Sequence, residues 1–182
     1  MRVSRNYTFL EIAEQAFVDY DKLKAELMDE ETFVDGTEEQ IEKAEALDKI
    51  YIKVIVFLAM YLEAYIWDCG ATYMGEKVME RLDKLGPLDK WVIIPRMVLG
   101  KPFPIKPHHQ GYLKALFQER NALIHHKSID IRPFVGKLTP EEKYPKGLIE
   151  FWDRIDLHQY FEVMRYLTST LNEEIESNKK WL

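Results

Sequence analysis

Apolar residues recur at helical spacing along most of the chain. Between residues 8 and 28 this spacing is loose, whereas Leu47, Tyr51, Val54, Leu58 and Leu62 follow one another at intervals of three or four residues. Such intervals place side chains on one face of a helix. From 54 to 61 the chain is apolar all round, which is typical of a helix buried on several sides, either inside a bundle or in a contact between subunits.

Caps and helix breakers predict where these helices begin and end. Thr37, followed by acidic residues, is a suitable N-cap for a long helix that ends near residue 74, just before Gly75. The acidic stretch 29–36 in front of it is expected to be a loop. Asp89 is the expected cap of a short helix. In addition to the two helices above, we expect helices at 76–85, 90–94, 108–124 and from 156 to about 176.

Two segments contain several prolines and are expected to be irregular. Residues 100–107 hold three prolines, which remove backbone donors, and 129–146 is expected to be a loop or a short strand-like excursion. Because no segment alternates apolar and polar residues for long, strand content should be near zero. The sequence therefore predicts one all-α domain over 1–182, a bundle of four or five main helices with a long proline-rich connection before the helix at 108–124.

Composition limits the class of protein. The chain has 182 residues, 47% of them hydrophobic and 31% charged, which is the balance of a soluble globular domain. Cys69 is the only cysteine, so neither an intramolecular disulfide nor a thiolate metal cluster can form. The longest unbroken apolar run, 54–62, is far shorter than the ~20 residues of a membrane span. The N-terminus has no signal-peptide core. We therefore expect a cytoplasmic protein without a membrane segment.

Charge is distributed unevenly along the chain. The net charge is −6, yet residues 84–137 contain ten Lys or Arg against three acids, a net +7 that leaves −13 elsewhere. Such an asymmetry can mark a surface that faces a polyanion. The alternative is that acidic helices simply pair with a basic segment inside the fold. The acidic part, residues 11–50 with fourteen acids and four lysines, would repel RNA unless it faces away.

No common nucleotide or zinc motif is present. The chain has neither a GxGxxG nor a GxxxxGK[ST] segment, and it has no HExxH. Two adjacent histidine pairs lie at 108–109 and 125–126. Residues 109 and 125 on one helix would be ~24 Å apart, and adjacent histidines diverge by ~100°. We therefore expect no intrachain metal site and no cofactor.

The candidate chemistry lies at the end of the helix at 108–124. Arg120, Asn121 and His125 fall within six residues of the basic segment. Asn121 and His125 share a helix face, and Arg120 is ~140° from His125 but has a long side chain. A guanidinium binds phosphate, and an imidazole moves protons near neutral pH. These groups suffice for metal-free cleavage of RNA, whose 2′-hydroxyl is the nucleophile. Alternatively, the cluster only stabilises a helix end.

The segment 120–125 resembles the Rx4–6H motif of HEPN domains (higher eukaryotes and prokaryotes nucleotide-binding) in its R-N-x-x-x-H form. Two further segments support this resemblance, and Gly100-Lys101 precedes the motif helix much as it does in relatives. Residues 62–66, Leu-Glu-Ala-Tyr-Ile, resemble the "LEA-aromatic-I" pattern of the second helix in one branch of the superfamily. Residues 88–91, Leu-Asp-Lys-Trp, resemble its "KW" segment. The ordered set spans about 47–127 and is more specific than the short motif alone.

The resemblance implies site residues. HEPN domains are helical bundles that commonly dimerise and bring two motifs together, and many are metal-independent endoribonucleases of toxin–antitoxin, phage-defence or CRISPR-associated systems. Carried over, Arg120 and His125 are the catalytic pair and Asn121 supports them. Glu63 is the candidate for a polar residue on an earlier helix, or else a buried structural carboxylate. His126 is a further supporting candidate, although the pattern gives it no fixed role.

The resemblance also implies partners. The leading expectation is a homodimeric ribonuclease that acts on single-stranded RNA, with an antitoxin or a nucleotidyltransferase as a possible partner. One alternative is a non-catalytic dimerising module that binds a partner protein or a nucleotide. Another is an all-α structural protein. The apolar middle of the helix that ends near 74 and the helix at 108–124 are the expected dimer contacts.

Overall fold

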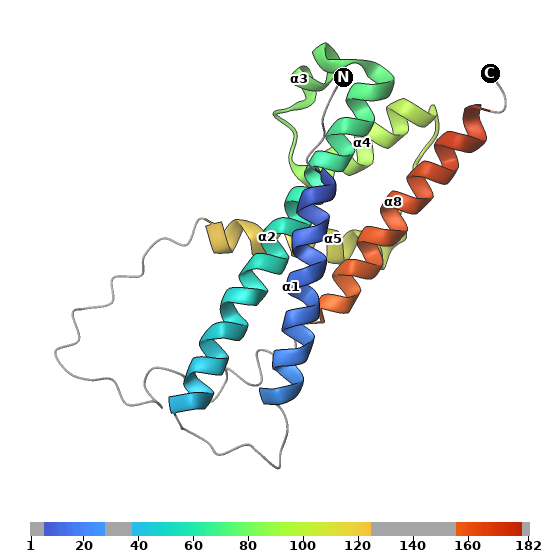
Figure 1. Cartoon of the computed structure of the whole chain (residues 1–182). Coiled ribbons are helices and arrows are strands. Elements are labelled where there is room, and N and C mark those ends of the chain that lie inside the picture. The colour runs from blue at the N-terminus through green and yellow to red at the C-terminus, as the bar shows by residue number, and fades with distance from the viewer. Residues whose placement is uncertain (1–5, 28–37, 125–155, 180–182) are drawn as a thin grey trace.

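The computed structural model describes residues 6–27, 38–124 and 156–179. Every regular element in these residues is a helix, which confirms the predicted all-α bundle (Figure 1). The helices are α1 (Asn6–Leu27), α2 (Glu38–Met74), α3 (Glu76–Leu82), α4 (Pro87–Leu99), α5 (Pro107–Ile124) and α8 (Leu157–Lys179). The loops predicted at 29–36 and 129–146 lie outside the described residues.

Helix α2 is the centre of the bundle and packs against each of the other five helices. Its fully buried side chains repeat at helical spacing, and they include Leu47, Ile55, Leu58, Leu62 and Ile66. Over Glu42–Met74 the helix has the length and hydropathy of a membrane span, a property shared by the central helices of soluble bundles. The other helices cover it on several sides, so the fold is compatible with a soluble protein.

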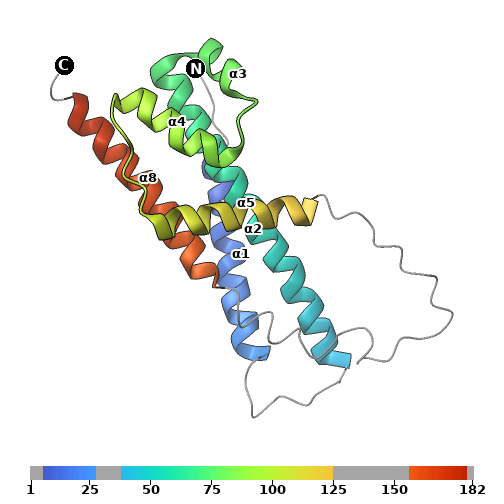
Figure 2. The same ribbon diagram turned by 180° about the vertical axis from the view of Figure 1, so that it is seen from behind.

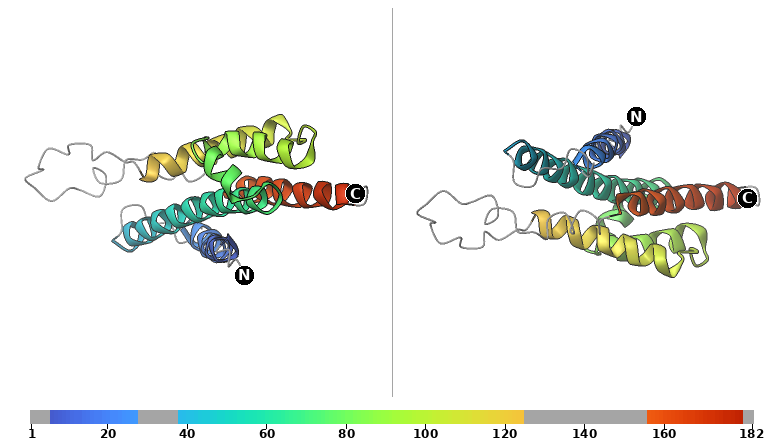
Figure 3. Two further views of the ribbon diagram at one scale, coloured as in Figure 1. Left: turned by 90° about the horizontal axis from the view of Figure 1, so that it is seen from above. Right: turned by 90° about the horizontal axis from the view of Figure 1, so that it is seen from below.

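The helices form three layers, as Figure 3 shows in end-on views. The middle layer contains α2 and α8. Helix α1 lies on one side of it, and α4 and α5 lie on the other side. Rings from α1 and α8 stack where Phe17 meets Phe161, with centroids 4.5 Å apart. Helix α5 runs across α2 and α8 (Figure 2) and contacts both of them.

Helix α4 is longer than predicted, since it runs over Pro87–Leu99 rather than 90–94. Proline suits the first helical position, where no backbone donor is needed, so Pro87 begins the helix, and Asp89 lies in its first turn instead of capping it. Pro95 stands inside the helix and removes one hydrogen bond. Burial of Trp91, Ile94 and Leu99 offsets that loss.

Two details at the ends of α4 and α5 agree with the sequence. Gly100 ends α4 in the left-handed conformation at φ 67°, and its N–H donates to the carbonyl of Arg96. Residues 101–106 are irregular, as the prolines predict. Helix α8 holds this connection, because Lys101 pairs with Glu174 at 2.5 Å and the Tyr166 hydroxyl donates to the Pro104 carbonyl at 2.7 Å. This connection fixes where α5 begins.

Candidate functional site

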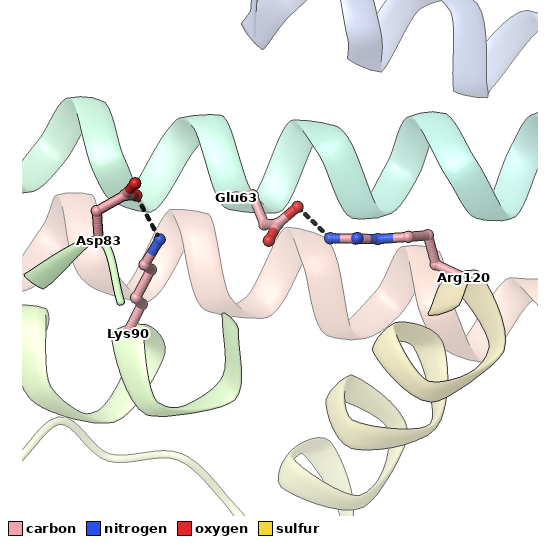
Figure 4. Close-up of polar contacts among 4 residues, drawn as sticks. All are labelled: Glu63, Asp83, Lys90 and Arg120. Atoms are coloured by element: carbon pink, nitrogen blue, oxygen red, sulfur yellow. Dashed lines mark hydrogen bonds and ion pairs between the residues drawn. The ribbon is translucent and has the colours of Figure 1, made fainter. Parts of the chain in front are cut away.

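Glu63 of α2 and Arg120 of α5 form an ion pair between two helices (Figure 4). They are 57 residues apart in sequence, and Nη2 of Arg120 donates to Oε2 of Glu63. The exposed fraction is 16% for the Arg120 side chain and 32% for that of Glu63. The guanidinium is thus close to the surface, but its positive charge is already compensated by a carboxylate.

Packing holds Arg120 on the inner side of α5. Its guanidinium carbon lies 6.0 Å from the centre of the Phe117 ring, one turn earlier. Its Nε is buried and has no hydrogen-bond partner among the described residues. A buried donor without an acceptor costs free energy. The ion pair with Glu63 therefore satisfies only some of the hydrogen-bond donors of this guanidinium.

The other predicted site residues fall into two groups. Asn121 is described and exposed, about 100° around α5 from Arg120, and its side chain has no contact with the Glu63/Arg120 ion pair among the interactions of the described residues. His125 and His126 lie outside the described residues. The convergence of an imidazole with Arg120 therefore stays a prediction, whereas the meeting of Arg120 with Glu63 is observed.

Glu119 makes a polar contact with α8 that the sequence analysis did not predict. The hydroxyl of Tyr160 on α8 donates to Oε2 of Glu119 at 3.0 Å. Burial, reinforced by this carboxylate, raises the pKa of Tyr160 and that of Tyr51 on α2. Neighbouring residues of α5 thus anchor to two different helices, Arg120 to α2 and Glu119 to α8. The sequence did hold a signal, because Glu119 is the only acid in α5.

The two segments that support the HEPN resemblance lie side by side. Tyr65 of the 62–66 segment stacks on Trp91 of the 88–91 segment, with centroids 6.0 Å apart and planes 2° apart. The Tyr65 hydroxyl also donates to Asn172 of α8 at 2.7 Å. Lys90 is buried and pairs with Asp83 at 3.0 Å (Figure 4). These residues join α2, α4 and α8 close to Glu63.

The histidines at the start of α5 are far along the helix from Arg120. His109 is only 3% exposed, and its ring centre lies 4.1 Å from that of Tyr166. Burial lowers the pKa of His109, and the neighbouring His108 and Lys106 lower it further. Within the described residues, no group of three or more His, Cys, Asp or Glu side chains is arranged to hold a metal ion.

Comparison with known proteins adds no information about the candidate site. No family model matches the chain, and neither the curated proteins nor the solved structures give a significant match. The resemblance to HEPN domains therefore rests on the motif and on the two supporting segments.

Proposed function

We propose that this chain is a metal-independent endoribonuclease that works as a homodimer in the cytoplasm, as a toxin or defence component. The observation that carries the proposal is the meeting of Glu63 and Arg120. The resemblance implies that some relatives use a polar residue on an earlier helix, and the candidate for it, Glu63, is bonded to the motif arginine although the two are 57 residues apart in sequence. No cofactor is required, because RNA provides its own nucleophile.

The proposed reaction uses two groups of the motif. The 2′-hydroxyl of RNA attacks the adjacent phosphorus, and the bond from phosphorus to the 5′-oxygen breaks. His125 moves one of the two protons, that of the attacking hydroxyl or that of the leaving oxygen, and water exchanges the other. Arg120 stabilises the charge that develops on the phosphoryl oxygens, and Glu63 holds the guanidinium in position. The products are a 2′,3′-cyclic phosphate and a 5′-hydroxyl, so DNA is not a substrate.

A dimer fits this reaction better than a single chain does. Side chains at 120 and 125 diverge by ~140° on an ideal helix. Arg120 is on the inner side of α5 and bonded to α2. A second copy can supply the other member of a catalytic pair across a symmetry axis, as the resemblance implies. In that arrangement Asn121, which is exposed on α5, supports the contact or the bound strand.

Cleavage of mixed single-stranded RNA in EDTA tests the proposal. Wild type is compared with Arg120→Ala and His125→Ala, and with His108→Ala as a control that removes an exposed histidine from the other end of α5. We expect a loss of at least about a hundredfold in the first two variants and little change in the control. Melting temperatures show whether each variant folds. Equal activity in all four proteins would contradict the proposal.

A second candidate is a non-catalytic dimerising module. The observation that favours it is that Glu63 neutralises Arg120 and that the Arg120 side chain is only 16% exposed. Such a module would leave RNA intact while light scattering shows the mass of a dimer. The toxin role and any antitoxin or nucleotidyltransferase partner belong to the first candidate.

A further inference from the structure

One side of α4 is used neither by the core nor by the candidate site. The residues on this side follow one another at intervals of three or as direct neighbours, and we call them the outer face of α4: Asp89, Val92, Ile93, Arg96 and Met97. All of them are exposed except Ile93, which is half-buried. Because the buried Trp91 holds the opposite side of the helix against Tyr65 of α2, the outer face points away from the bundle.

The outer face of α4 carries adjoining apolar side chains. Val92 is 42% exposed and Met97 is 50% exposed, and Ile93 lies between them on the helix. By contrast, the exposed Tyr7 and Val18 of α1 are about three turns apart. Single exposed apolar residues are common, whereas apolar residues that adjoin one another at the surface are typical of an interaction site.

Two charged residues flank these apolar residues along the helix. Asp89 precedes Val92 by three positions, and Arg96 follows Ile93 by three positions. Among the described residues, neither charged side chain has an ion-pair or hydrogen-bond partner. On an ideal helix the two are ~10.5 Å apart along the axis and only ~20° apart around it. Both charges therefore lie on the midline of the outer face, one at each end of its apolar centre.

This order of residues is complementary to itself when one copy is turned end to end. A two-fold contact uses the same surface on both copies, so that residue i meets residue j and j meets i. If two α4 helices pack antiparallel about an axis between Val92 and Ile93, Asp89 of each copy faces Arg96 of the other. Val92 of each copy then faces Ile93 of the other. A parallel pair would instead bring like charges together, so the charge order favours the antiparallel contact.

The middle of α2 was also an expected dimer contact, but a single chain already covers much of it. Val54, Ile55 and Leu58 are fully buried, and α1 packs along α2. The core of the bundle therefore accounts for these apolar residues. Among the described helices, the outer face of α4 is more accessible to a second copy than the middle of α2 is.

We propose that the outer face of α4 binds a second copy of this chain, with the two α4 helices antiparallel about a two-fold axis between Val92 and Ile93. Two equivalent ion pairs join Asp89 of each copy to Arg96 of the other. The inference deepens the proposed function by naming the contact of the homodimer, and it rests on that proposal only for the expectation of a dimer. Helices α4 and α5 lie on the same side of the middle layer, so this contact puts both α5 helices on the side where the copies meet (Figure 3).

Sedimentation equilibrium of the full chain tests this contact. Because interfaces below about 1,200 Å² are typical of weak complexes, one pair of 13-residue helices should give a micromolar dissociation constant. Asp89→Lys and Arg96→Glu should each raise this constant at least about tenfold, since either change places like charges opposite each other at both ends of the contact. Glu11→Lys and Lys22→Glu are the matched controls, because they reverse exposed charges on α1 and should change the constant little.

A mixture of the two charge variants tests the antiparallel arrangement. The reversed residue of each variant faces an opposite charge on the other variant, so the two chains are complementary at both ends of the contact. An equimolar mixture of Asp89→Lys and Arg96→Glu should therefore dimerise about as tightly as wild type, although neither variant does so alone. Melting temperatures show whether each variant folds. Where a charge variant does not fold, Val92→Ser carries the test, because it should weaken the dimer without a change of charge.

The outcomes separate this contact from the proposed nuclease. A wild type that stays monomeric at every concentration overturns the contact. Folded charge variants that dimerise as wild type does, or whose mixture stays monomeric, also overturn it. If the contact is overturned and wild type still cleaves RNA in EDTA, the nuclease stands. If the mixture restores the dimer and RNA stays intact with wild type, the contact stands and the nuclease falls.

Discussion

Arg120 serves both the fold and the proposed reaction. Its bond to Glu63 joins α5 to α2, and the same guanidinium is the proposed partner of a phosphate. A phosphate that reaches it must compete with a carboxylate, so Glu63 positions the arginine at some cost to its affinity for anions. The ion pair is partly shielded from solvent, so its contribution to the free energy of unfolding should be large enough to measure.

A double-mutant cycle on Glu63→Gln and Arg120→Gln measures that contribution. We expect a coupling free energy of about 1 kcal/mol, above the value for an exposed pair and below that for a deeply buried one. The stability losses of the two single variants should therefore add up to more than the loss in the double variant, by the coupling free energy. Urea unfolding of the four proteins gives the numbers. Strictly additive changes would mean that the ion pair does not form in solution.

His109 predicts a dependence of stability on pH. Its folded pKa lies below the ordinary value of 6.5, because it is buried next to His108 and Lys106, with Glu162 of α8 as the opposing charge. As pH falls below about 6.5, the unfolded chain binds the proton first, so the folded state loses stability. Urea unfolding between about pH 7 and 5.5 should show this slope. His109→Gln should flatten the slope and His108→Gln should keep more of it. Equal slopes in wild type and His109→Gln would contradict the assignment.

Only some of the site residues could be predicted from the sequence. Arg120 and Asn121 follow from the motif, and Glu63 follows from the resemblance. The Glu119 contact with Tyr160 could not be predicted, because it depends on where α8 crosses α5, which helical periodicity does not specify. The same holds for the stacking of Tyr65 on Trp91.

At the scale of helices, local signals account for most boundaries. Gly75 ends α2 and Gly100 ends α4, both at positive φ, as glycines at helix ends do. The length of α4 was not predictable from local signals, since Pro95 would normally end or kink a helix and only the burial of its neighbours keeps it helical. In α4, tertiary packing therefore overrides the low helix propensity of proline, and the local sequence predicts only part of the helix.

Two glycines of different helices give opposite predictions for the same substitution. A Cβ at Gly70 of α2 would lie within 3.1 Å of Ile94 and would collide with the buried Met79 side chain. Gly70→Ala should therefore destabilise the protein by about 1–2 kcal/mol. Gly111→Ala meets nothing within 4 Å and should stabilise it by about 0.5–1 kcal/mol. Thermal unfolding of both variants checks this, and stabilisation by Gly70→Ala would contradict the packing of α2 against α3 and α4.

At the scale of the whole molecule, the order of the helix layers determines where the acidic and basic residues lie relative to one another. The sequence predicted an acidic and a basic part, but it could not predict whether they pair or face apart. In the described helices both occur, because Lys101 pairs with Glu174 of α8 and Arg120 pairs with Glu63 of α2, whereas the exposed acids of α1 lie on the opposite side of the α2 and α8 layer from α5 (Figure 3). The charge asymmetry of the sequence therefore corresponds in part to ion pairs within the fold.

The products left by the wild-type protein in EDTA test the central claim most directly. An RNA strand and a DNA strand of the same sequence are incubated with it, and the ends of any fragments are identified by mass spectrometry. The account predicts that RNA is cut to fragments with 2′,3′-cyclic phosphate ends and that DNA stays intact, because only RNA carries the nucleophile. Intact RNA in the presence of a folded dimer, or fragments with 3′-hydroxyl ends, would contradict it.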